Sequence, residues 1–258
     1  MVDKVLFEKV GKVGIIRLHR PEVLNCLDPE TLRQFKGYLE RIRGEKQIQV
    51  IMICGNGRAF CTGMDLKYAK GKSPQEISEI NHCGLVETFA YLQRFPKPTI
   101  AVIQGYALGG GFELALSCDF RVASKEQAIF GFPEIDLGIL PTWGGLFLPI
   151  WIVGYSQTME LVLSGKKIDA PTAYTMGLVT KLVAHDQLFE EALAFAKELA
   201  RKGAFQLQLA KYIIQHSITP DQKERLRLST LAMELITAGP EGENRLNSLL
   251  AAEEKQKD

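Results

Sequence analysis

The chain has 258 residues, of which 46% are hydrophobic and 24% charged, and its formal net charge is +1 at pH 7. This composition is typical of a globular protein with a sizeable buried core, and the small net charge offers no global field that would attract nucleic acid or an anionic membrane. The five cysteines and four histidines have neither C-x-x-C nor metal-ligand spacing, so we expect no zinc site and no disulfide framework. The charged N-terminus does not resemble a signal peptide, and no window approaches the ~20 apolar residues of a membrane span. We therefore expect a cytoplasmic, metal-free protein.

The first part of the chain places an amphipathic helix between two apolar runs. Residues 13–18 and 49–54 are apolar and β-branched, and are predicted to form buried strands. Between them, Asp28 followed by Pro29 gives an N-cap with proline at the first helical position. Apolar side chains then recur at helical spacing, at Leu32, Phe35, Leu39 and Ile42. A glycine-bearing loop, residues 55–67, follows the second strand.

The middle of the chain repeats this order. Apolar residues at helical spacing predict a helix that carries Leu85, Phe89 and Leu92. Strands are then predicted over residues 99–103 and 120–123, with a helix over 112–118 between them. Strands that alternate with helices indicate an α/β fold with crossover connections.

Beyond residue 186 the pattern becomes helical. Helices are predicted over residues 187–202, 204–216 and 221–237, and a last one follows the break at Gly239-Pro240. These helices either cover the α/β core or form an appendage that packs on another subunit. We divide the chain into a core of residues 1–186 and a helical region of residues 187–258.

Three consecutive glycines, residues 109–111, lie between the strand at 99–103 and the following helix. Glycines at this point let the backbone approach a ligand closely, with free N–H groups facing it. Glu113 falls in the first helical turn, where the helix dipole favours its ionised form. Such a segment can bind a developing negative charge and move a proton. The alternative is a glycine corner required only for tight packing of strand and helix.

Several motifs together resemble the crotonase (enoyl-CoA hydratase/isomerase) superfamily, in family order and spacing from about residue 10 to about residue 185. The segments that carry the resemblance are His19-Arg-Pro-Glu-Val-Leu-Asn25, Gly57-Arg-Ala-Phe-Cys-Thr-Gly-Met-Asp-Leu66, Gly105-Tyr-Ala-Leu-Gly-Gly-Gly-Phe-Glu113, Pro133-Glu-Ile-Asp-Leu-Gly-Ile-Leu-Pro141 and Gly177-Leu-Val179. Each segment alone is a weak signal, but the set is specific.

The resemblance implies a spiral of repeated ββα units and a helical C-terminal trimerisation region, in a homotrimer or a dimer of trimers. It implies an acyl-CoA thioester substrate, no separate cofactor, and an enolate-like oxyanion held by two backbone N–H groups. By position in the motifs, these donors are Met64 and Gly110. Fixed donors aimed at developing charge need no reorganisation during the reaction.

The pair Glu113 and Glu134 matches the two glutamates that hold a water molecule in the hydratases of this family. Two carboxyl groups around one water suit syn addition, since one takes a proton from the attacking oxygen and the other returns a proton to Cα. We expect Glu113 to act as the base, kept ionised by the helix N-terminus, and Glu134 to act as the acid. Because close carboxyl groups titrate as a pair, the division between them stays open.

The resemblance also assigns contacts at the two ends of the substrate. The coenzyme A contacts are Val23, Leu24, Arg58, Ala59, Thr62 and Lys67, while Arg58 and Lys67 are equally compatible with solvated surface charges. Hydratases commonly continue after the proline of the fourth motif with Gly-Ala-Gly-Gly-Thr, whereas this chain has Thr142-Trp143-Gly144-Gly145-Leu146. We therefore expect the acyl pocket to be formed by Phe132, Thr142 and Trp143.

The sequence thus favours a hydratase that converts a 2-enoyl-CoA into a 3-hydroxyacyl-CoA. The same apparatus is compatible with a hydratase or hydrolase for a cyclic or dienoyl-CoA, or with an enoyl-CoA isomerase. A non-enzymatic alternative is an RNA-binding or scaffolding homologue. The run Lys223-Glu-Arg-Leu-Arg227 is too short and too mixed in charge to favour RNA binding.

Overall fold

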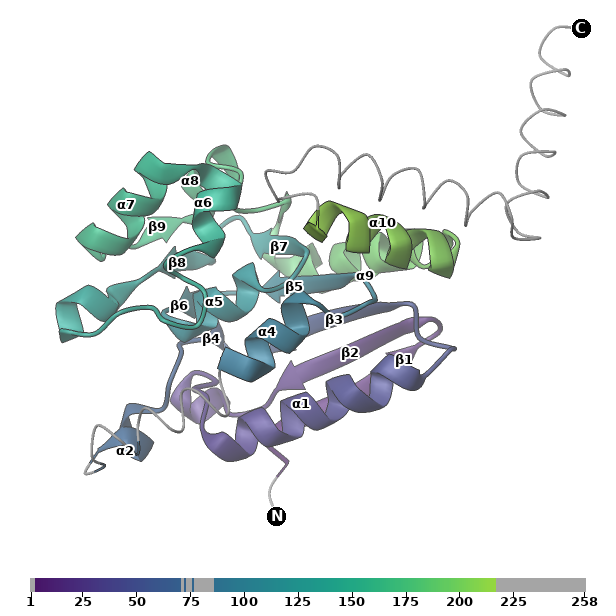
Figure 1. Ribbon diagram of the computed structural model, residues 1–258, viewed down its shortest axis with the longest axis horizontal. Coiled ribbons are helices and arrows are strands. Elements are labelled where there is room, and N and C mark those ends of the chain that lie inside the picture. The colour runs from purple at the N-terminus through teal and green to yellow at the C-terminus, as the bar shows by residue number, and fades with distance from the viewer. Residues whose placement is uncertain (1–2, 71, 73–75, 77–85, 217–258) are drawn as a thin grey trace, which may run out of the picture. The chain divides into compact units, whose positions relative to one another are not determined.

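The computed structural model describes residues 3–70, 72, 76 and 86–216. By internal contacts the chain divides into two units, residues 1–201 and 202–258. The first unit contains two β-sheets and the helices around them (Figure 1). Of the second unit, the described part is one helix, α10 (Ala204–His216).

The larger sheet has six strands, and the first two form an antiparallel hairpin. The other neighbours in this sheet are parallel, as expected of strands joined by crossover connections. In spatial order the strands are β1 (Val5–Val10), β2 (Val13–Leu18), β3 (Val50–Gly55), β5 (Thr99–Ile103), β7 (Phe120–Ser124) and β10 (Lys181–Val183). Central strand β3 is buried on both faces, which explains its nearly continuous run of apolar side chains.

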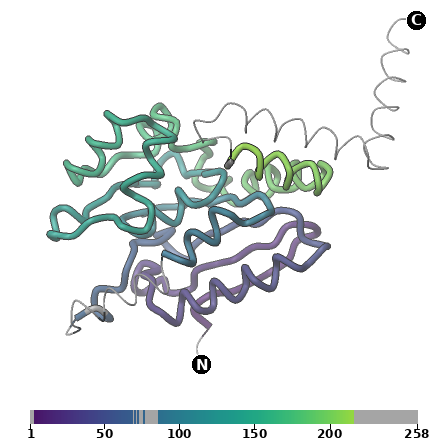
Figure 2. Tube along the Cα trace, viewed as in Figure 1, coloured from purple at the N-terminus to yellow at the C-terminus, as the bar shows by residue number. Residues whose placement is uncertain are grey.

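The smaller sheet runs in the order β4 (Ala59–Cys61), β6 (Tyr106–Leu108), β8 (Ile129–Gly131) and β9 (Ile168–Asp169). Strands β4, β6 and β8 are parallel to one another, and β9 is antiparallel to β8. Each successive pair, β3 with β4, β5 with β6 and β7 with β8, places its first strand in the large sheet and its second in the small one. Figure 2 follows the chain through these turns. The predicted spiral of repeated units is therefore confirmed.

Helices fill the space between the two sheets and cover their outer faces. Their bounds are α1 (Pro29–Gly44), α2 (Leu66–Ala69), α4 (Glu87–Gln93), α5 (Gly110–Leu116), α6 (Leu148–Val153), α7 (Tyr155–Ser164), α8 (Ala170–Thr175) and α9 (Leu188–Leu199), with 3₁₀ turns η1 (Pro21–Val23), η3 (Pro133–Leu137) and η4 (His185–Gln187). Helix α1 begins as predicted, because Asp28 accepts a hydrogen bond from the Thr31 N–H. None of the helices in the described ranges combines the length and the apolar character needed to cross a membrane.

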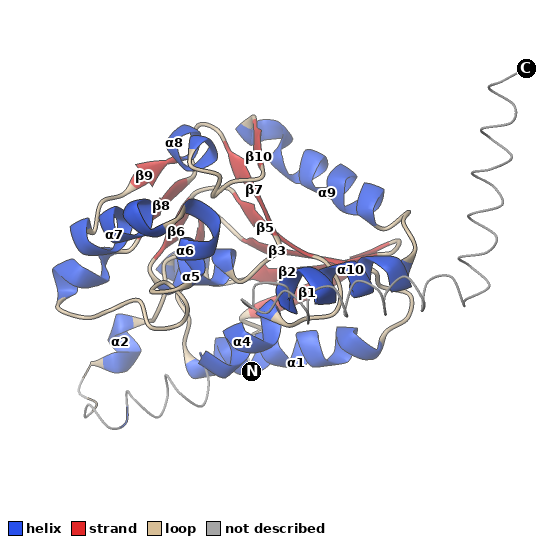
Figure 3. Cartoon of the chain, turned by 45° about the horizontal axis from the view of Figure 1, so that its top comes forward, coloured by secondary structure: helices blue, strands red, loops and turns tan. Residues whose placement is uncertain are grey.

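Helix α9 belongs to the core and not to the appendage. Its buried residues Leu188, Ala192 and Ala196 pack against one face of the large sheet, and α1 and α4 pack against the other (Figure 3). Internal contacts place the division between the two units after residue 201, whereas the division made from the sequence follows residue 186. A six-stranded sheet with one bare apolar face would expose its core to water, which is why α9 is needed there.

The predicted strands at 13–18, 49–54, 99–103 and 120–123 correspond to β2, β3, β5 and β7 within one residue at each end. The predicted helix at 112–118 begins two residues earlier, at Gly110, since the glycines themselves enter the first turn. The three-residue strands of the small sheet are too short for a period to show in sequence. Leu85, the predicted helix at 221–237 and the last helix lie outside the described residues.

Two neighbouring alanines in α9 provide a test of this packing. Ala192 is fully buried against the sheet, whereas Ala194 is exposed on the same helix. We expect Ala192→Asp to lower the free energy of unfolding by at least ~2 kcal/mol, because an unpaired carboxylate would be buried. Ala194→Asp should change it by no more than ~0.5 kcal/mol. Urea unfolding of both variants measures the difference, and equal stabilities would mean that α9 is not part of the core.

Candidate active site

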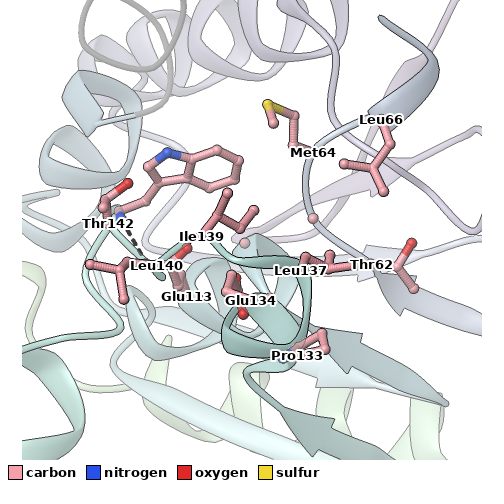
Figure 4. A pocket seen from close by; sticks show the side chains of 14 residues that line it. Thr62, Met64, Leu66, Glu113, Pro133, Glu134, Leu137, Ile139, Leu140 and Thr142 are labelled. Atoms are coloured by element: carbon pink, nitrogen blue, oxygen red, sulfur yellow. Dashed lines mark hydrogen bonds between the residues drawn. The ribbon is translucent and has the colours of Figure 1, made fainter. Parts of the chain in front are cut away.

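A cavity of about 390 Å³ opens where β4, β6 and β8 end. Because these strands are parallel, the segments that follow them all leave the same edge of the small sheet. The volume falls within the ~300–1,000 Å³ typical of small-molecule sites. Of the residues predicted from the sequence, the cavity is lined by Thr62, Met64, Gly110, Glu113, Glu134, Thr142 and Trp143 (Figure 4).

Residues 109–111 follow β6, and each of the three glycines faces a different neighbour. A Cβ on the first would lie 2.7 Å from a carboxylate oxygen of Glu134. A Cβ on the second would lie 2.0 Å from the ring of Trp143, and one on the third 2.0 Å from the carbonyl oxygen of Cys61. Such distances exclude a side chain at all three positions. Tight packing therefore accounts for the third glycine, while the first two bring the backbone against residues that line the cavity.

The loop after β4 holds the amide of Met64 in a defined direction. The Leu27 N–H donates to the carbonyl of Gly63 over 2.8 Å, and the Asp65 N–H donates to the carbonyl of Leu27 over 2.9 Å. In such a bridge the polar backbone groups of the residue between, Met64, point away from Leu27. Among the described residues, neither the Met64 N–H nor the Gly110 N–H donates a hydrogen bond to another group.

Gly63, the residue before Met64, lies close to the Gly110 amide. A Cβ on Gly63 would lie 2.9 Å from the nitrogen of Gly110, so the absence of a side chain there keeps the approach to this nitrogen clear. The φ of Gly63 is +88°, a left-handed conformation that favours glycine. Two N–H donors without partners, on facing segments of one cavity, form an arrangement able to bind an oxyanion.

Glu113 is buried in the first turn of α5, with only 1% of its surface exposed. Its Oε1 accepts hydrogen bonds from the N–H groups of Trp143 (2.7 Å) and Gly145 (2.8 Å). Burial raises the pKa of Glu113 to about 8, although those two donors oppose the shift, and the nearby charge of Glu134 raises it further. Burial therefore acts against the effect expected of the N-terminus of this seven-residue helix, which favours the ionised carboxyl.

Glu134 lies in η3, directly after β8, and is 7% exposed. Its Oε2 is buried and has no hydrogen-bond partner among the described residues. Burial raises the pKa of Glu134 to about 7. Because a buried oxygen without a partner is costly, a ligand or water that donates a hydrogen bond there would be bound favourably. Two carboxyl groups that titrate near neutrality are suited to exchanging protons with a ligand.

Of the three residues predicted to form an acyl pocket, the cavity is lined by two, Thr142 and Trp143. Trp143 lines it and packs edge-on against Phe89, with ring centroids 5.7 Å apart. Phe132 does not line it: this side chain is fully buried and packs on Phe112 at 4.7 Å. Phe132 therefore supports α5 from behind. Its proximity to Glu134 in sequence was misleading, because the chain turns sharply between them at Pro133.

Sequence reasoning missed the apolar wall opposite the glycines. This wall consists of side chains that are between 45% and 57% exposed, namely Leu66, Leu137, Ile139 and Leu140. Leu137 ends the short turn η3 and residues 138–140 lie in the loop that follows it, so periodicity could not identify them. The signal in the sequence is a cluster of large apolar residues directly after the acidic turn that carries Glu134.

The predicted coenzyme A contacts are spread more widely. Val23 and Leu24 are half-buried at η1, where the Thr62 hydroxyl donates to the Leu24 carbonyl over 3.4 Å. Arg58 and Lys67 are exposed outside the cavity. Ala59 is buried within β4, so a ligand would contact its backbone and not its side chain. Within the same ranges, no three His, Cys, Asp or Glu side chains gather as a metal site would require.

The raised pKa of Glu113 makes a prediction for stability. A carboxyl whose pKa rises from 4.5 to about 8 on folding stabilises the folded protein below pH 4.5, and this contribution is lost as the pH rises towards 8. The glutamine of Glu113→Gln does not ionise, so the variant does not lose this stability as the pH rises. Its side-chain oxygen can still accept hydrogen bonds from both N–H groups. We expect its melting temperature to exceed that of the wild type by at least ~2 °C at pH 9. The gap should shrink towards pH 5. Glu198→Gln, at an exposed position, should show no such trend in differential scanning fluorimetry.

A profile of the enoyl-CoA hydratase/isomerase family matches residues 8–257. A protein of Rhizobium meliloti named probable enoyl-CoA hydratase is 37% identical over 225 residues, covering 87% of this chain and 86% of that one. A crotonyl-CoA hydratase of Syntrophomonas wolfei is 30% identical over 96% of this chain and 95% of that one. The solved structure of an enoyl-CoA hydratase from Bacillus anthracis superposes with a TM-score of 0.92 at 32% identity, covering 98% of this chain and 97% of that one. The chain is therefore an enzyme of the enoyl-CoA hydratase/isomerase family, with the crotonase fold.

Proposed function

We propose that the protein adds water to a 2-enoyl-CoA thioester and so forms a 3-hydroxyacyl-CoA. The observation that carries this proposal is that two buried carboxyl groups, Glu113 and Glu134, and the amides of Met64 and Gly110, which have no acceptor in the described part of the chain, line one cavity. The names of the relatives, probable enoyl-CoA hydratase and crotonyl-CoA hydratase, support the same reaction class.

The two amides would stabilise the charge that develops during the addition. When the oxygen of water bonds to C3 of the enoyl group, the electrons of the double bond move towards the thioester carbonyl, whose oxygen becomes enolate-like. The N–H groups of Met64 and Gly110 donate to this oxygen. Such donors act strongly in a buried site, because they replace water without having to reorient. Removing one typically slows a reaction by ~100-fold to ~1,000-fold.

The two glutamates would handle the protons. One carboxylate takes a proton from water as the C3–O bond forms, and the other carboxyl gives a proton to C2, so the pair keeps the same number of protons. With pKa values of about 8 and about 7, the pair at neutral pH is suited to holding one proton. The division of roles stays open: the two N–H groups that donate to Glu113 favour its ionised form and hence its role as the base, whereas the higher pKa of Glu113 favours Glu134 as the base. We propose that no cofactor is needed, since coenzyme A is part of the substrate.

We expect Glu113→Gln and Glu134→Gln each to lower kcat by at least ~100-fold, the scale of general acid–base catalysis, with little change in KM. A coupled assay with crotonyl-CoA measures both constants. The exposed control, Glu198→Gln, should keep the wild-type values. Near-normal turnover in both glutamine variants would exclude the hydratase mechanism.

The shape of the acyl group is the second testable property of this site. The Trp143 ring lies over Gly110, at the point where the acyl chain would continue past the oxyanion donors. A flat apolar wall at this depth favours short or planar acyl groups, including cyclic and dienoyl chains, over long flexible ones.

We expect Trp143→Ala to raise kcat/KM for a long-chain enoyl-CoA relative to crotonyl-CoA by about 10-fold, since each methylene in an apolar pocket contributes ~1–3 kcal/mol. A panel of crotonyl-CoA, a cyclohexenoyl-CoA and a long-chain enoyl-CoA gives these ratios for wild type and variant. If the ratios do not change, Trp143 does not set selectivity. Preferred turnover of the cyclic substrate by the wild type would favour the cyclic-acyl alternative.

We also propose that the protein is a homo-oligomer, either a trimer or a dimer of trimers. Large apolar side chains on α6 and α7 support this: Trp151 is 64% exposed, Tyr155 69% and Leu163 58%. Clusters of such side chains mark interaction surfaces in soluble proteins. The cytoplasmic location expected from the sequence stays a prediction.

A further inference from the structure

The guanidinium of Arg20 joins two segments of the chain that are distant in sequence. Its Nη1 donates to the carbonyl of Cys26 over 2.8 Å, and its Nη2 donates to Oδ2 of Asp65 over 2.8 Å. Both partners of the ion pair are largely buried, with 13% of the Arg20 side chain and 11% of the Asp65 side chain exposed. Charged groups removed from water in this way are costly to separate, so the geometry of the pair is well defined.

These contacts lie beside the bridge that directs the Met64 amide. Cys26 directly precedes Leu27, and Asp65 directly follows Met64, so Arg20 links the two segments whose pairing orients that amide. The bridge itself consists of two backbone hydrogen bonds and belongs to neither sheet. An isolated bridge of this size is weak, and a buried guanidinium that spans it supplies two more hydrogen bonds between the same segments.

The arginine is in turn anchored to a long helix. Its Nη1 lies 3.3 Å from Oδ2 of Asp28, which caps α1 and is also paired with the Lys4 ammonium. Burial alone would raise the pKa of Asp28, but hydrogen bonds from Lys4 and Thr31 lower it below its ordinary value, so this carboxylate is ionised at neutral pH. Asp65 likewise accepts the Lys67 N–H at the start of α2. Arg20, through Asp28 and Asp65, therefore connects the start of α1 to the segment that carries Met64.

We propose that Arg20 is a positioning residue, which holds the Met64 amide in the orientation needed to bind the thioester oxyanion. The proposal rests on the hydratase function proposed above and adds to it a residue outside the cavity lining. Arginine is required because its planar fork reaches a carbonyl and a carboxylate at once, whereas a lysine ammonium is a single point charge. A donor displaced by ~1 Å can reduce a rate by ~100-fold.

The test compares Arg20→Lys with Arg33→Lys. Arg33 is 66% exposed, pairs with Glu30 on the surface of α1, and so controls for the loss of an arginine ion pair. We expect Arg20→Lys to lower kcat for crotonyl-CoA by about 10-fold or more, with KM within about threefold, and Arg33→Lys to change neither. Hydrogen exchange followed by mass spectrometry should show faster exchange in the peptide that includes residues 62–68 of Arg20→Lys only.

Asp65→Asn provides a second route to the same contact, because asparagine keeps the helix-capping oxygen but removes the charge. We expect the kcat of Asp65→Asn to fall as that of Arg20→Lys does. Because both changes break the same contact, the double variant should be no slower than the slower of the two single variants. An unchanged kcat in a folded Arg20→Lys, a loss confined to KM, or unchanged exchange at residues 62–68 would overturn the proposal. If the wild type turns over no enoyl-CoA, the hydratase function fails, and exchange alone then decides whether Arg20 orders this loop.

Discussion

The close approach of the backbone at residues 109–111 is the constraint on which the rest of the site depends. Without side chains there, the carboxylate of Glu134, the ring of Trp143 and the carbonyl of Cys61 all reach the main chain. A single Cβ at any of the three positions would separate elements drawn from β4, η3 and the loop before α6. The cavity exists because three independent segments close on one stretch of bare backbone.

This arrangement removes two acidic groups from most of their contact with bulk water. Burial is the largest influence on the pKa of both Glu113 and Glu134, and it moves both towards neutrality. Two backbone donors partly offset the cost of burying Glu113, but one oxygen of Glu134 has no hydrogen-bond partner in the part of the chain that the structure describes. Functional sites commonly retain such unfavourable features, since a fully satisfied carboxyl group would have no reason to bind water or substrate.

Much of the fold could be predicted from local pattern. The apolar runs that became β2, β3, β5 and β7 are long enough to show strand character, and Asp28-Pro29 marks the start of α1 without help from tertiary contacts. The site residues supplied by the family resemblance, Glu113, Glu134, Met64 and Gly110, all line one cavity. Strands such as β4 and β6 could not be predicted, because three residues are too few to show an alternation of apolar and polar side chains.

The errors have physical causes as well. Phe132 is adjacent to the site in sequence, but strand alternation and the turn at Pro133 direct it into the core. The pKa of Glu113 is raised by burial among segments that are distant in sequence, one of which carries Trp143, 30 residues away. The contact of Arg20 with Asp65 spans 45 residues, and nothing in either local segment indicates it. Each of these features arises from the packing of segments that are separate in sequence.

Three loops, one after each parallel strand of the small sheet, contribute residues to the site. The loops after β4 and β6 contribute the amides, while the loop after β8 contributes Glu134 and most of the exposed apolar wall. Each loop leaves its own strand, and neighbouring strands are separated by only ~4.8 Å. Changes at Leu137, Ile139 and Leu140 would therefore reshape the apolar wall without touching either amide. Because the groups placed to stabilise charge come from the first two loops, a new acyl preference does not require a new way to stabilise charge.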